Sequence, residues 1–367
     1  MTKPRVLFVS RERFRLPLDD TQRRKWDAVG ELLDYRILAA AQPGSPTQAE
    51  RMSLAPPSSA LDGPLYYVRL PRRIVRELRA FRPDAAVVQG VHEANAFLAA
   101  RRVARAHTKL VLDIHGDWHV ATRLYGSPAR RLLNPVGDLM GVIAVRRADA
   151  IRTLSPFTTA IVRRLGREPD GEFPAFLDRD VFLADPPAPL PECPRALFVG
   201  VLERYKGFDT LAAAWPRVAT AVPGAELHVV GRGTLFAHAR ELAASGATWT
   251  PSLEAAGVAT ALDESWLLCL PSRAEGLGRV VIEAMSRGRA TVGGDAGGIP
   301  DLVEDGENGL LVTPGDDAQL ADALIRILRD RAEAARLGAA ARRRGESLMP
   351  PPAEYAARVR ALIDGLR

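Results

Sequence analysis

The stretch of sequence that decides the fold is Leu270-Pro-Ser-Arg-Ala-Glu275-Gly-Leu-Gly278-Arg-Val-Val-Ile-Glu283-Ala-Met285. It begins at the end of an apolar run, continues through a loop with two glycines, and becomes a helical pattern from about Gly278. This order predicts one strand–loop–helix unit of a parallel α/β sheet. The unpaired N–H groups at such a helix start lie at the positive end of the helix dipole, so they suit a diphosphate.

The same alternation of short apolar runs and longer helical patterns extends along the chain in both directions. In the N-terminal half the predicted strands are Val6–Val9, Tyr35–Ala39, Leu65–Val68, Ala85–Val88, Leu110–Ile114 and Ala150–Thr153. In the C-terminal half they are Arg195–Val199, Glu226–Val230, Thr248–Thr250, Trp266–Leu270, Ala290–Gly293 and Gly309–Val312. Clear helical patterns are Pro71–Arg82, Asp317–Leu328 and Ala353–Leu366. The pattern predicts an α/β protein with two doubly wound sheets.

A proline-rich stretch, Asp185-Pro-Pro-Ala-Pro-Leu-Pro-Glu-Cys-Pro194, separates the two halves. Such a segment is stiff and cannot join the interior of a sheet, so it marks a linker between domains. We predict an N-terminal Rossmann-like domain over residues 1–185 and a C-terminal one over 186–345. A terminal helix within 346–367 is expected to cross back to the N-terminal domain. Ligands bind at the carboxyl ends of strands in such sheets, so we expect the domains to face a central cleft.

Composition narrows the class of protein. The 367 residues are 47% hydrophobic and 26% charged, a globular balance that argues against overall disorder. No run approaches the roughly 18 apolar residues that cross a bilayer, and we expect a cytoplasmic protein. Cys193 and Cys269 lie far apart, which supports neither a disulfide framework nor a zinc site. The net charge of +6 favours anionic partners without choosing among them.

Two carboxylates of the opening stretch are candidates for ligand binding. Glu275 comes just before the helix amides and is suited to accept hydrogen bonds from sugar hydroxyls, and Glu283 lies about two turns into the helix, where it would reach a ribose diol. Spacing alone is more typical of an acid that stabilises a helix start together with an ordinary surface acid. The surrounding motifs therefore have to decide between the two interpretations.

These motifs form an ordered set. After Glu275-Gly-Leu-Gly and Glu283-Ala-Met come Gly297-Gly-Ile-Pro-Asp-Leu-Val and Asp305-Gly-Glu-Asn-Gly-Leu-Leu-Val. Before them stand Phe198-Val-Gly-Val-Leu-Glu-Arg-Tyr-Lys-Gly207, Leu227-His-Val-Val-Gly-Arg-Gly233, Ala148-Asp-Ala-Ile-Arg-Thr-Leu-Ser-Pro-Phe157 and Phe173-Pro-Ala-Phe-Leu-Asp178. From about Val111 onward the set resembles the retaining GT-B glycosyltransferases of family 4, the glycosyl transferases group 1. The N-terminal hundred residues match only loosely.

The resemblance implies a role for each matching residue. Lys206 corresponds to the lysine that binds the donor diphosphate, Glu275 to the acid that holds the donor sugar and Glu283 to the acid that binds ribose. His115, after a predicted strand, corresponds to a histidine that faces the donor sugar from the N-terminal domain. The implied catalytic set is thus His115, Lys206 and Glu275. The implied donor-binding set also includes Gly200, Arg204, Gly276, Leu277, Gly278 and Glu283.

Two positions depart from the family pattern. Val201 stands where the family has an arginine after the glycine, and Arg204, three residues on, is the candidate replacement for its charge. The paired glycines expected after the first strand are also missing. Arg11, Arg13 and Arg15 follow that strand instead and are candidates to bind phosphate or the acceptor.

Three other signals have a structural and a functional interpretation. Gly231-Arg-Gly233 lacks the third glycine of a dinucleotide fingerprint and indicates a tight strand-to-helix turn. Asp178-Arg-Asp180 has the form of a metal-dependent diphosphate site but has no glycine loop beside it, so we expect a structural turn and no metal cofactor. The arginine-rich helix Pro71–Arg82 indicates either a solvated face or attachment to anionic lipid at the inner face of the membrane.

The predicted reaction moves a sugar from a nucleoside diphosphate sugar to an acceptor hydroxyl with retention of configuration, in the synthesis of a glycan, glycolipid or glycosylated metabolite. The C-terminal domain would bind the donor, with the nucleotide base near Trp249–Leu253, and the N-terminal domain would bind the acceptor. A nucleotide-sugar epimerase and a non-catalytic sugar-nucleotide-binding scaffold are the alternatives. A dehydrogenase is disfavoured because the full glycine fingerprint with a following acidic residue is absent from the sequence. Nucleic-acid binding is supported only by the overall positive charge, without a recognisable binding module.

Overall fold

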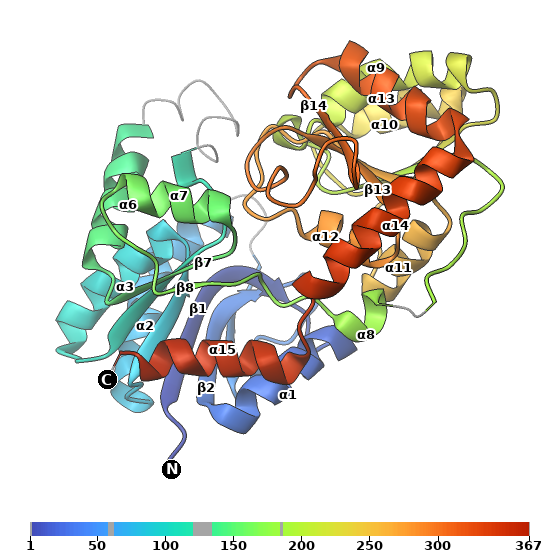
Figure 1. Ribbon diagram of the computed structural model, residues 1–367. Coiled ribbons are helices and arrows are strands. Elements are labelled where there is room, and N and C mark those ends of the chain that lie inside the picture. The colour runs from blue at the N-terminus through green and yellow to red at the C-terminus, as the bar shows by residue number, and fades with distance from the viewer. Residues whose placement is uncertain (1, 58–61, 120–133, 184–185, 367) are drawn as a thin grey trace. The chain divides into compact units, whose positions relative to one another are not determined.

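The computed structural model describes residues 2–57, 62–119, 134–183 and 186–366. They form two compact units (Figure 1). Unit 1 consists of Met1–Phe176 with Pro351–Arg367, and unit 2 of Leu177–Pro350. Each unit is built on its own, mainly parallel sheet with packed helices, so the predicted pair of doubly wound α/β domains is confirmed.

The sheet of unit 1 has the strand order β3-β4-β2-β1-β5-β6-β7-β8. Its strands are β1 (Arg5–Phe14), β2 (Asp34–Ala41), β3 (Gln48–Ala49), β4 (Met52–Ala55), β5 (Ala85–Gln89), β6 (Lys109–Ile114), β7 (Ala150–Thr153) and β8 (Gly171–Glu172). All pairs are parallel except β3 with β4. The chain therefore winds outward from β1 in both directions, and β1 is next to the point where the order reverses.

Helices cover both faces of this sheet. They are α1 (Asp20–Leu32), α2 (Asp62–Ala80), α3 (Val91–Ala104), α6 (Asn134–Arg147), α7 (Pro156–Arg164) and α15 (Pro352–Asp364). Alternate strand residues separate two cores: Val6 and Ile37 pack with α1 and α15, whereas Leu7 and Leu38 pack with α2, α3 and α6. Figure 1 shows α15, the last helix, lying beside α1.

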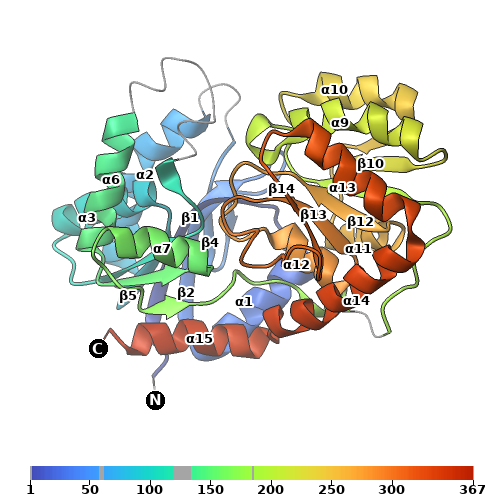
Figure 2. The ribbon, with the colours of Figure 1, turned by 45° about the horizontal axis from the view of Figure 1, so that its top comes forward.

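The sheet of unit 2 is parallel, with the order β11-β10-β9-β12-β13-β14. Its strands are β9 (Arg195–Val199), β10 (Glu226–Val230), β11 (Ala247–Thr250), β12 (Leu267–Leu270), β13 (Ala290–Gly294) and β14 (Gly309–Val312). Its helices are α8 (Arg179–Phe182), η1 (Arg204–Lys206), α9 (Phe208–Ala221), α10 (Phe236–Glu241), η2 (Leu242–Ser245), α11 (Ala255–Asp263), α12 (Arg279–Ser286), α13 (Asp317–Arg329) and α14 (Arg331–Leu348). α9 packs against α13, and α12 against α14 (Figure 2).

The change from unit 1 to unit 2 comes at Leu177, before the proline-rich linker. α8 packs against α11 and α12, and Arg287 Nη1 donates a hydrogen bond to the Val181 carbonyl at 3.4 Å. These contacts assign the residues just before the linker to unit 2. The segment from Pro351 onward belongs to unit 1 because Tyr355 and Val359 are buried in the same core as α1.

Two predictions about the first hundred residues were wrong. Leu65–Val68 is not a strand but lies in α2, where Tyr66, Leu70, Ile74 and Leu78 are buried at intervals of one helical turn. The first strand does not end at Val9. β1 continues to Phe14, because its pairing with β2 shifts register after Val9 and resumes at Arg13.

Candidate active site

The loop after β9 contacts the loop after β12 because Gly207 has no side chain. Gly207 follows η1 in the left-handed region, with φ 69°. A Cβ on this residue would lie 1.9 Å from the carbonyl oxygen of Pro271, the first residue after β12. Arg273 N donates a hydrogen bond to the Tyr205 carbonyl at 2.8 Å and ties the loops together. Two stretches far apart in sequence thus meet at the carboxyl ends of β9 and β12, which are adjacent strands of the unit 2 sheet.

Lys206 and Glu275 form an ion pair across these loops. Their side chains are 18% and 11% exposed, so the pair is largely withdrawn from water. Ser272 Oγ donates a second hydrogen bond to Glu275 Oε1 at 3.2 Å. The structure therefore brings together two of the residues implicated by the sequence. Ser272, which lies in the same motif, was not singled out.

The helix start predicted near Gly278 is observed. α12 begins at Arg279, after Gly278 in the left-handed conformation, with φ 73° and ψ 55°. Gly276 and Leu277 lead into it, and Leu277 is buried. Gly298 N donates a hydrogen bond to the Glu275 carbonyl at 3.0 Å, which supports this loop from the segment after β13. The first amides of α12 thus lie just beyond Glu275, at the positive end of the helix dipole, a position where an anion would be stabilised.

Glu283 is a buried carboxyl on α12 whose ion-pair partner is an exposed arginine of the same helix. It is 8% exposed, and Arg279 Nη2 lies 3.7 Å from Glu283 Oε1. Burial raises the pKa of Glu283, and the Arg279 guanidinium lowers it by a smaller amount. A buried acid of this kind is destabilising unless it gains a hydrogen-bond partner, which is what a ligand hydroxyl would supply.

Arg204 is turned toward solvent. Its side chain is 74% exposed, and its Nε lies 3.4 Å from Asp209 Oδ2. Asp209 is held more firmly by Arg273, whose Nη1 and Nη2 lie 2.6 Å and 3.1 Å from its two oxygens. Arg273 lies in the stretch Leu270–Met285, but the sequence motifs did not identify it as a positively charged residue near the site. Gly200 and Val201 precede these residues, and Val201 is 42% exposed.

The turn at Gly231 connects β10 to α10 and supports Trp249. Gly231 lies against the loop after β9, since a Cβ there would be 1.8 Å from the Gly200 carbonyl oxygen. Trp249 Nε1 donates a hydrogen bond to the Gly231 carbonyl at 2.9 Å, and its ring centroid lies 4.5 Å from that of Phe236. The indole is 38% exposed. The strand–turn–helix form predicted for Gly231-Arg-Gly233 is confirmed.

His115 belongs to unit 1, where it follows β6. Its Nδ1 lies 3.1 Å from Gln89 Nε2, and its Nε2 lies 3.0 Å from Asp113 Oδ2. The arrangement fits the tautomer in which Nε2–H donates to Asp113 and Nδ1 accepts from Gln89. The ring is therefore fixed on both sides by residues at the ends of neighbouring strands.

Asp113 is in turn paired with a buried arginine. Arg152 Nη1 lies 2.8 Å from Asp113 Oδ2, and the two residues are partners in the β6–β7 register. Burial alone would raise the pKa of Asp113, but the Arg152 guanidinium and His115 lower it to about 2. Arg152 also donates to the Phe173 and Pro174 carbonyls at 3.2 Å and 2.8 Å. This chain of bonds fixes His115 on a buried Asp113–Arg152 ion pair.

The three candidate arginines of the N-terminal segment lie in or just after the extended β1. Arg11 stacks over Tyr67, with its guanidinium carbon 5.8 Å from the ring centroid. Tyr67 donates a hydrogen bond to the buried Glu93 at 2.9 Å. Arg13 and Arg15 are exposed. They belong to unit 1, as His115 does.

Asp178 and Asp180 flank the start of α8, and Asp178 is buried. Within the described ranges, no group of three or more His, Cys, Asp or Glu side chains is arranged to hold a metal ion.

Comparison with known proteins assigns the family. Residues 193–330 match the family model described as Glycosyl transferases group 1, and residues 28–172 match the Glycosyl transferase 4-like domain. The chain belongs to the group 1 glycosyltransferases of family 4. This glycosyltransferase is 29% identical over 309 residues to a GDP-mannose-dependent alpha-(1-6)-phosphatidylinositol monomannoside mannosyltransferase of Mycobacterium tuberculosis. The match covers 78% of this chain and 76% of the relative.

Solved structures of glycosyltransferases share the GT-B fold of this chain. Sucrose-phosphate synthase from Thermosynechococcus elongatus matches with a TM-score of 0.79 and 19% identity, over 99% of this glycosyltransferase and 100% of that chain. HepE of Anabaena, in complex with UDP and glucose, matches with a TM-score of 0.70 and 18% identity, over 97% and 99% of the two chains. The predicted fold and family are confirmed.

Proposed function

We propose that this glycosyltransferase moves a sugar from a nucleoside diphosphate sugar to an acceptor hydroxyl, with retention of the anomeric configuration. The observation that carries the proposal is the Lys206–Glu275 pair just ahead of the α12 amides. It joins a cation suited to phosphate, a carboxylate suited to sugar hydroxyls and an anion-binding helix start in one region of unit 2. The GDP-mannose named for the Mycobacterium relative and the UDP bound to HepE support a nucleoside diphosphate donor.

In this mechanism the acceptor oxygen forms a bond to the anomeric carbon while the bond to the diphosphate oxygen breaks. The acceptor proton passes to the departing diphosphate on the same face of the sugar. Lys206 and the first amides of α12 stabilise the negative charge that grows on the leaving group. Glu275 holds the sugar hydroxyls. Glu283, whose burial disfavours the charged carboxylate, accepts hydrogen bonds from the ribose diol. The positive charge of Lys206 and the helix terminus is the reason that we propose no metal cofactor.

The remaining candidates have supporting roles in the proposal. The exposed Trp249 and the residues up to Leu253 bind the nucleotide base. Arg11, Arg13 and Arg15 of unit 1 bind the acceptor or its phosphate, and His115, fixed by Gln89 and Asp113, contacts the donor sugar. The product is a glycan, glycolipid or glycosylated metabolite, made on the cytoplasmic side of the membrane.

A thermal-shift screen tests the donor site. The purified protein is heated with UDP, GDP or ADP and with their common sugar conjugates, each with and without magnesium. A ligand that binds only the folded state raises the melting temperature by mass action. Stabilisation by one nucleotide family without magnesium is the expected result. No shift with any nucleotide would contradict the proposal and would mean that the changes at Val201 and in the loop after the first strand have disabled the donor site.

A second assay separates transfer from epimerisation. The donor identified by the screen is incubated with the enzyme alone and then with candidate acceptors. A changed sugar nucleotide in the absence of acceptor indicates an epimerase. An acceptor-dependent product with the donor's anomeric configuration, read from the anomeric proton coupling, is the expected result.

A further inference from the structure

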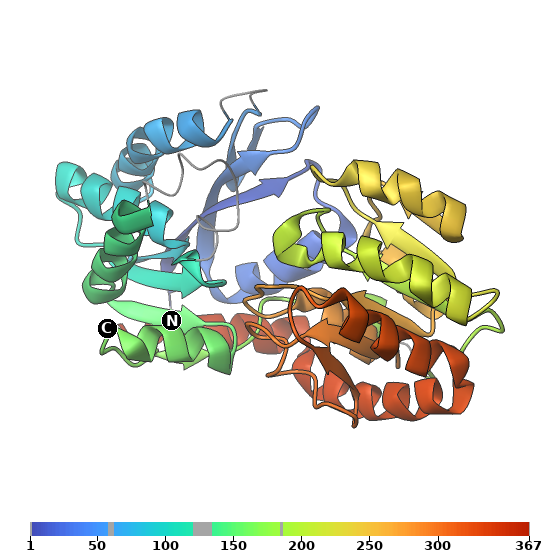
Figure 3. The same ribbon diagram turned by 90° about the horizontal axis from the view of Figure 1, so that it is seen from above.

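One helical layer of unit 1 carries most of the exposed apolar side chains. It consists of α2, α3 and α6, which pack side by side in that order on one face of the sheet (Figure 3). In the part of the chain that the structure describes, the large hydrophobic side chains that are exposed are Val68, Val103, Val136, Leu139, Ile143, Val201 and Trp249. The first five lie on this layer. Three of these five side chains, Val136, Leu139 and Ile143, lie on the single helix α6.

The apolar side chains of α6 form a stripe along its solvent side. Val136, Leu139 and Ile143 are about one helical turn apart and are 55%, 58% and 39% exposed. Ala144 and Val145 of the same helix are buried in the core of unit 1. α6 is therefore apolar on both its inner and its outer side, and the core of unit 1 accounts only for the inner one.

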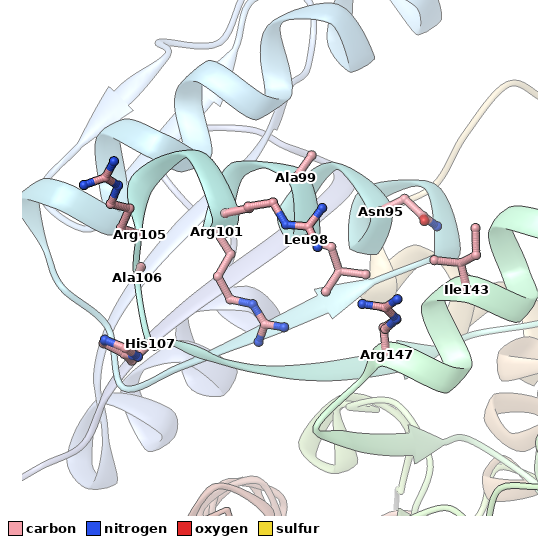
Figure 4. Close-up of a pocket in the computed structure, with 10 residues that line it drawn as sticks. Asn95, Leu98, Ala99, Arg101, Arg105, Ala106, His107, Ile143 and Arg147 are labelled. Atoms are coloured by element: carbon pink, nitrogen blue, oxygen red, sulfur yellow. The ribbon is translucent and has the colours of Figure 1, made fainter.

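The stripe leads into a basic hollow between α3 and α6. The hollow has a volume of about 630 Å³, and its lining includes Ile143 of the stripe together with Arg101, Arg102, Arg105 and Arg147 (Figure 4). Asn95 closes one end, where its amide donates to the Met140 carbonyl at 2.8 Å and ties α3 to α6. Apolar surface and positive charge are thus continuous on this side of unit 1.

Most of the charge in the hollow is not neutralised by side chains of the described residues. Arg101 pairs with Asp149 at 2.8 Å. Within the described residues, Arg102, Arg105 and Arg147 have no acidic partner. Arg105 also occupies the left-handed region, with φ 53°, at the end of α3, where glycine or asparagine would be less strained.

The neighbouring helix extends the positive surface. Arg69, Arg72, Arg76 and Arg79 of α2 are exposed, and the same helix carries the exposed Val68. The helical layer thus combines two features along its whole width, exposed apolar side chains and arginines. A soluble polyanion complements only the second feature, whereas an anionic bilayer complements both.

We propose that the layer formed by α2, α3 and α6 binds the surface of an anionic phospholipid bilayer. The stripe of Val136, Leu139 and Ile143 enters the boundary between headgroups and acyl chains, and the basic hollow receives lipid phosphates. The contact is peripheral, since none of the described helices is long and apolar enough to cross a membrane. This inference concerns a surface of unit 1 and does not depend on the identity of donor or acceptor.

Vesicle co-sedimentation tests the charged half of the surface. The full chain is mixed with phosphatidylcholine vesicles and with vesicles that also contain phosphatidylglycerol, at low and high salt. We expect binding only to the anionic vesicles, weakened by salt. Arg102→Glu with Arg147→Glu should lower the vesicle affinity at least about thirtyfold. The control variant combines Arg240→Glu with Arg343→Glu, at two exposed arginines of unit 2. It changes the net charge by the same amount and should change the vesicle affinity little.

A second pair of variants tests the apolar half. Val136→Ser with Leu139→Ser should lower the affinity for anionic vesicles about tenfold, because both side chains lose the favourable transfer out of water. Val201→Ser, at an exposed valine of unit 2, should not. All these residues are exposed, so the melting temperature of each variant should match that of the parent chain.

Three results would overturn the proposal. The first is absence of binding to anionic vesicles at low salt. The second is an equal loss of binding with the unit 2 arginine control, which would reduce the effect to net charge. The third is undiminished vesicle binding by the Val136→Ser/Leu139→Ser variant, which would show that the apolar side chains do not enter the bilayer and that the surface binds only anionic groups. None of these results depends on transferase activity, so they are distinguishable from a failure of the donor site.

Discussion

Lys206 and Glu275 form an ion pair that joins the loops after β9 and β12, two adjacent strands of the unit 2 sheet. Adjacent parallel strands end at the same edge of a sheet, which is why residues so far apart in sequence meet there. The carboxylate also accepts the Ser272 hydroxyl. The pair therefore keeps a cation and a carboxylate ready beside the start of α12, at a position where each would otherwise be a poorly solvated single charge.

Lys206→Ala should abolish most of the transfer activity. The variant removes the cation proposed to stabilise the departing diphosphate, and it leaves Glu275 largely buried without its partner. We expect turnover to fall about 100-fold or more, on the order of 3 kcal/mol in the barrier. Steady-state kinetics with the donor found by thermal shift measures the effect. Lys109→Ala, at an exposed lysine of unit 1, is the control and should keep full turnover. Near-normal activity of Lys206→Ala would remove Lys206 from the site.

Gly207→Ala should destabilise unit 2 far more than Gly224→Ala. Both glycines have positive φ, 69° and 85°, so an alanine costs roughly 1 kcal/mol at either position. Only at Gly207 would the new Cβ collide with backbone, 1.9 Å from the Pro271 carbonyl oxygen, and nothing lies within 4 Å at Gly224. The collision should raise the cost at Gly207 to roughly 3 kcal/mol or more and separate the two loops. Calorimetric melting of both variants checks this, and equal shifts would contradict the close approach of the loops.

The sequence predicted most elements of unit 2 because its signals are local. Arg195–Val199, Glu226–Val230 and Gly309–Val312 are observed with the predicted ends, since each is a short, mainly apolar run bounded by turn residues. Leu65–Val68 failed for the same reason. Its aromatic and aliphatic residues suit a strand locally, and only the burial of Tyr66 and Leu70 on one face identifies them as helical.

The surroundings of His115 could be predicted only in part. The motif indicated His115 itself, but Gln89, Asp113 and Arg152 come from three different strands. One signal was present, since Asp113 and Arg152 are charged residues that directly follow apolar residues in short strands. Such residues need partners, and the parallel register of β6 and β7 pairs them directly. That register depends on the order of strands in the sheet, which no local pattern contains.

Asp113→Asn should change how stability depends on pH. The folded-state pKa of Asp113 is about 2, below the ordinary value of 3.8. The carboxylate therefore contributes fully above about pH 4, and its contribution of about 2 kcal/mol is lost as the pH falls to about 2. At neutral pH the variant should be less stable by roughly 3 kcal/mol, because Arg152 remains buried without its partner. The difference between the two proteins should narrow toward pH 2.

Urea unfolding at a series of pH values measures that difference. Asp34→Asn removes a half-exposed partner of Arg5, at 3.7 Å, and should change the free energy of unfolding little. If the difference between Asp113→Asn and the parent protein stayed constant from pH 7 to pH 2, the carboxylate of Asp113 would not be the group that titrates.

Glu283→Gln should make the protein more stable and a worse binder of nucleotides. Burial raises the pKa of Glu283, so the folded state favours the protonated carboxyl, and the charged form lowers stability at neutral pH. The amide removes that charge while keeping the shape of the side chain, so the melting temperature without ligand should rise. The ribose diol loses a charged hydrogen-bond acceptor, and the affinity for the nucleotide should fall about tenfold to a hundredfold. Glu264→Gln, at an exposed side chain of unit 2, should change neither quantity. Melting curves of both variants with and without nucleotide measure both effects, and a stabilised variant that still binds the nucleotide normally would show that Glu283 does not contact the ribose.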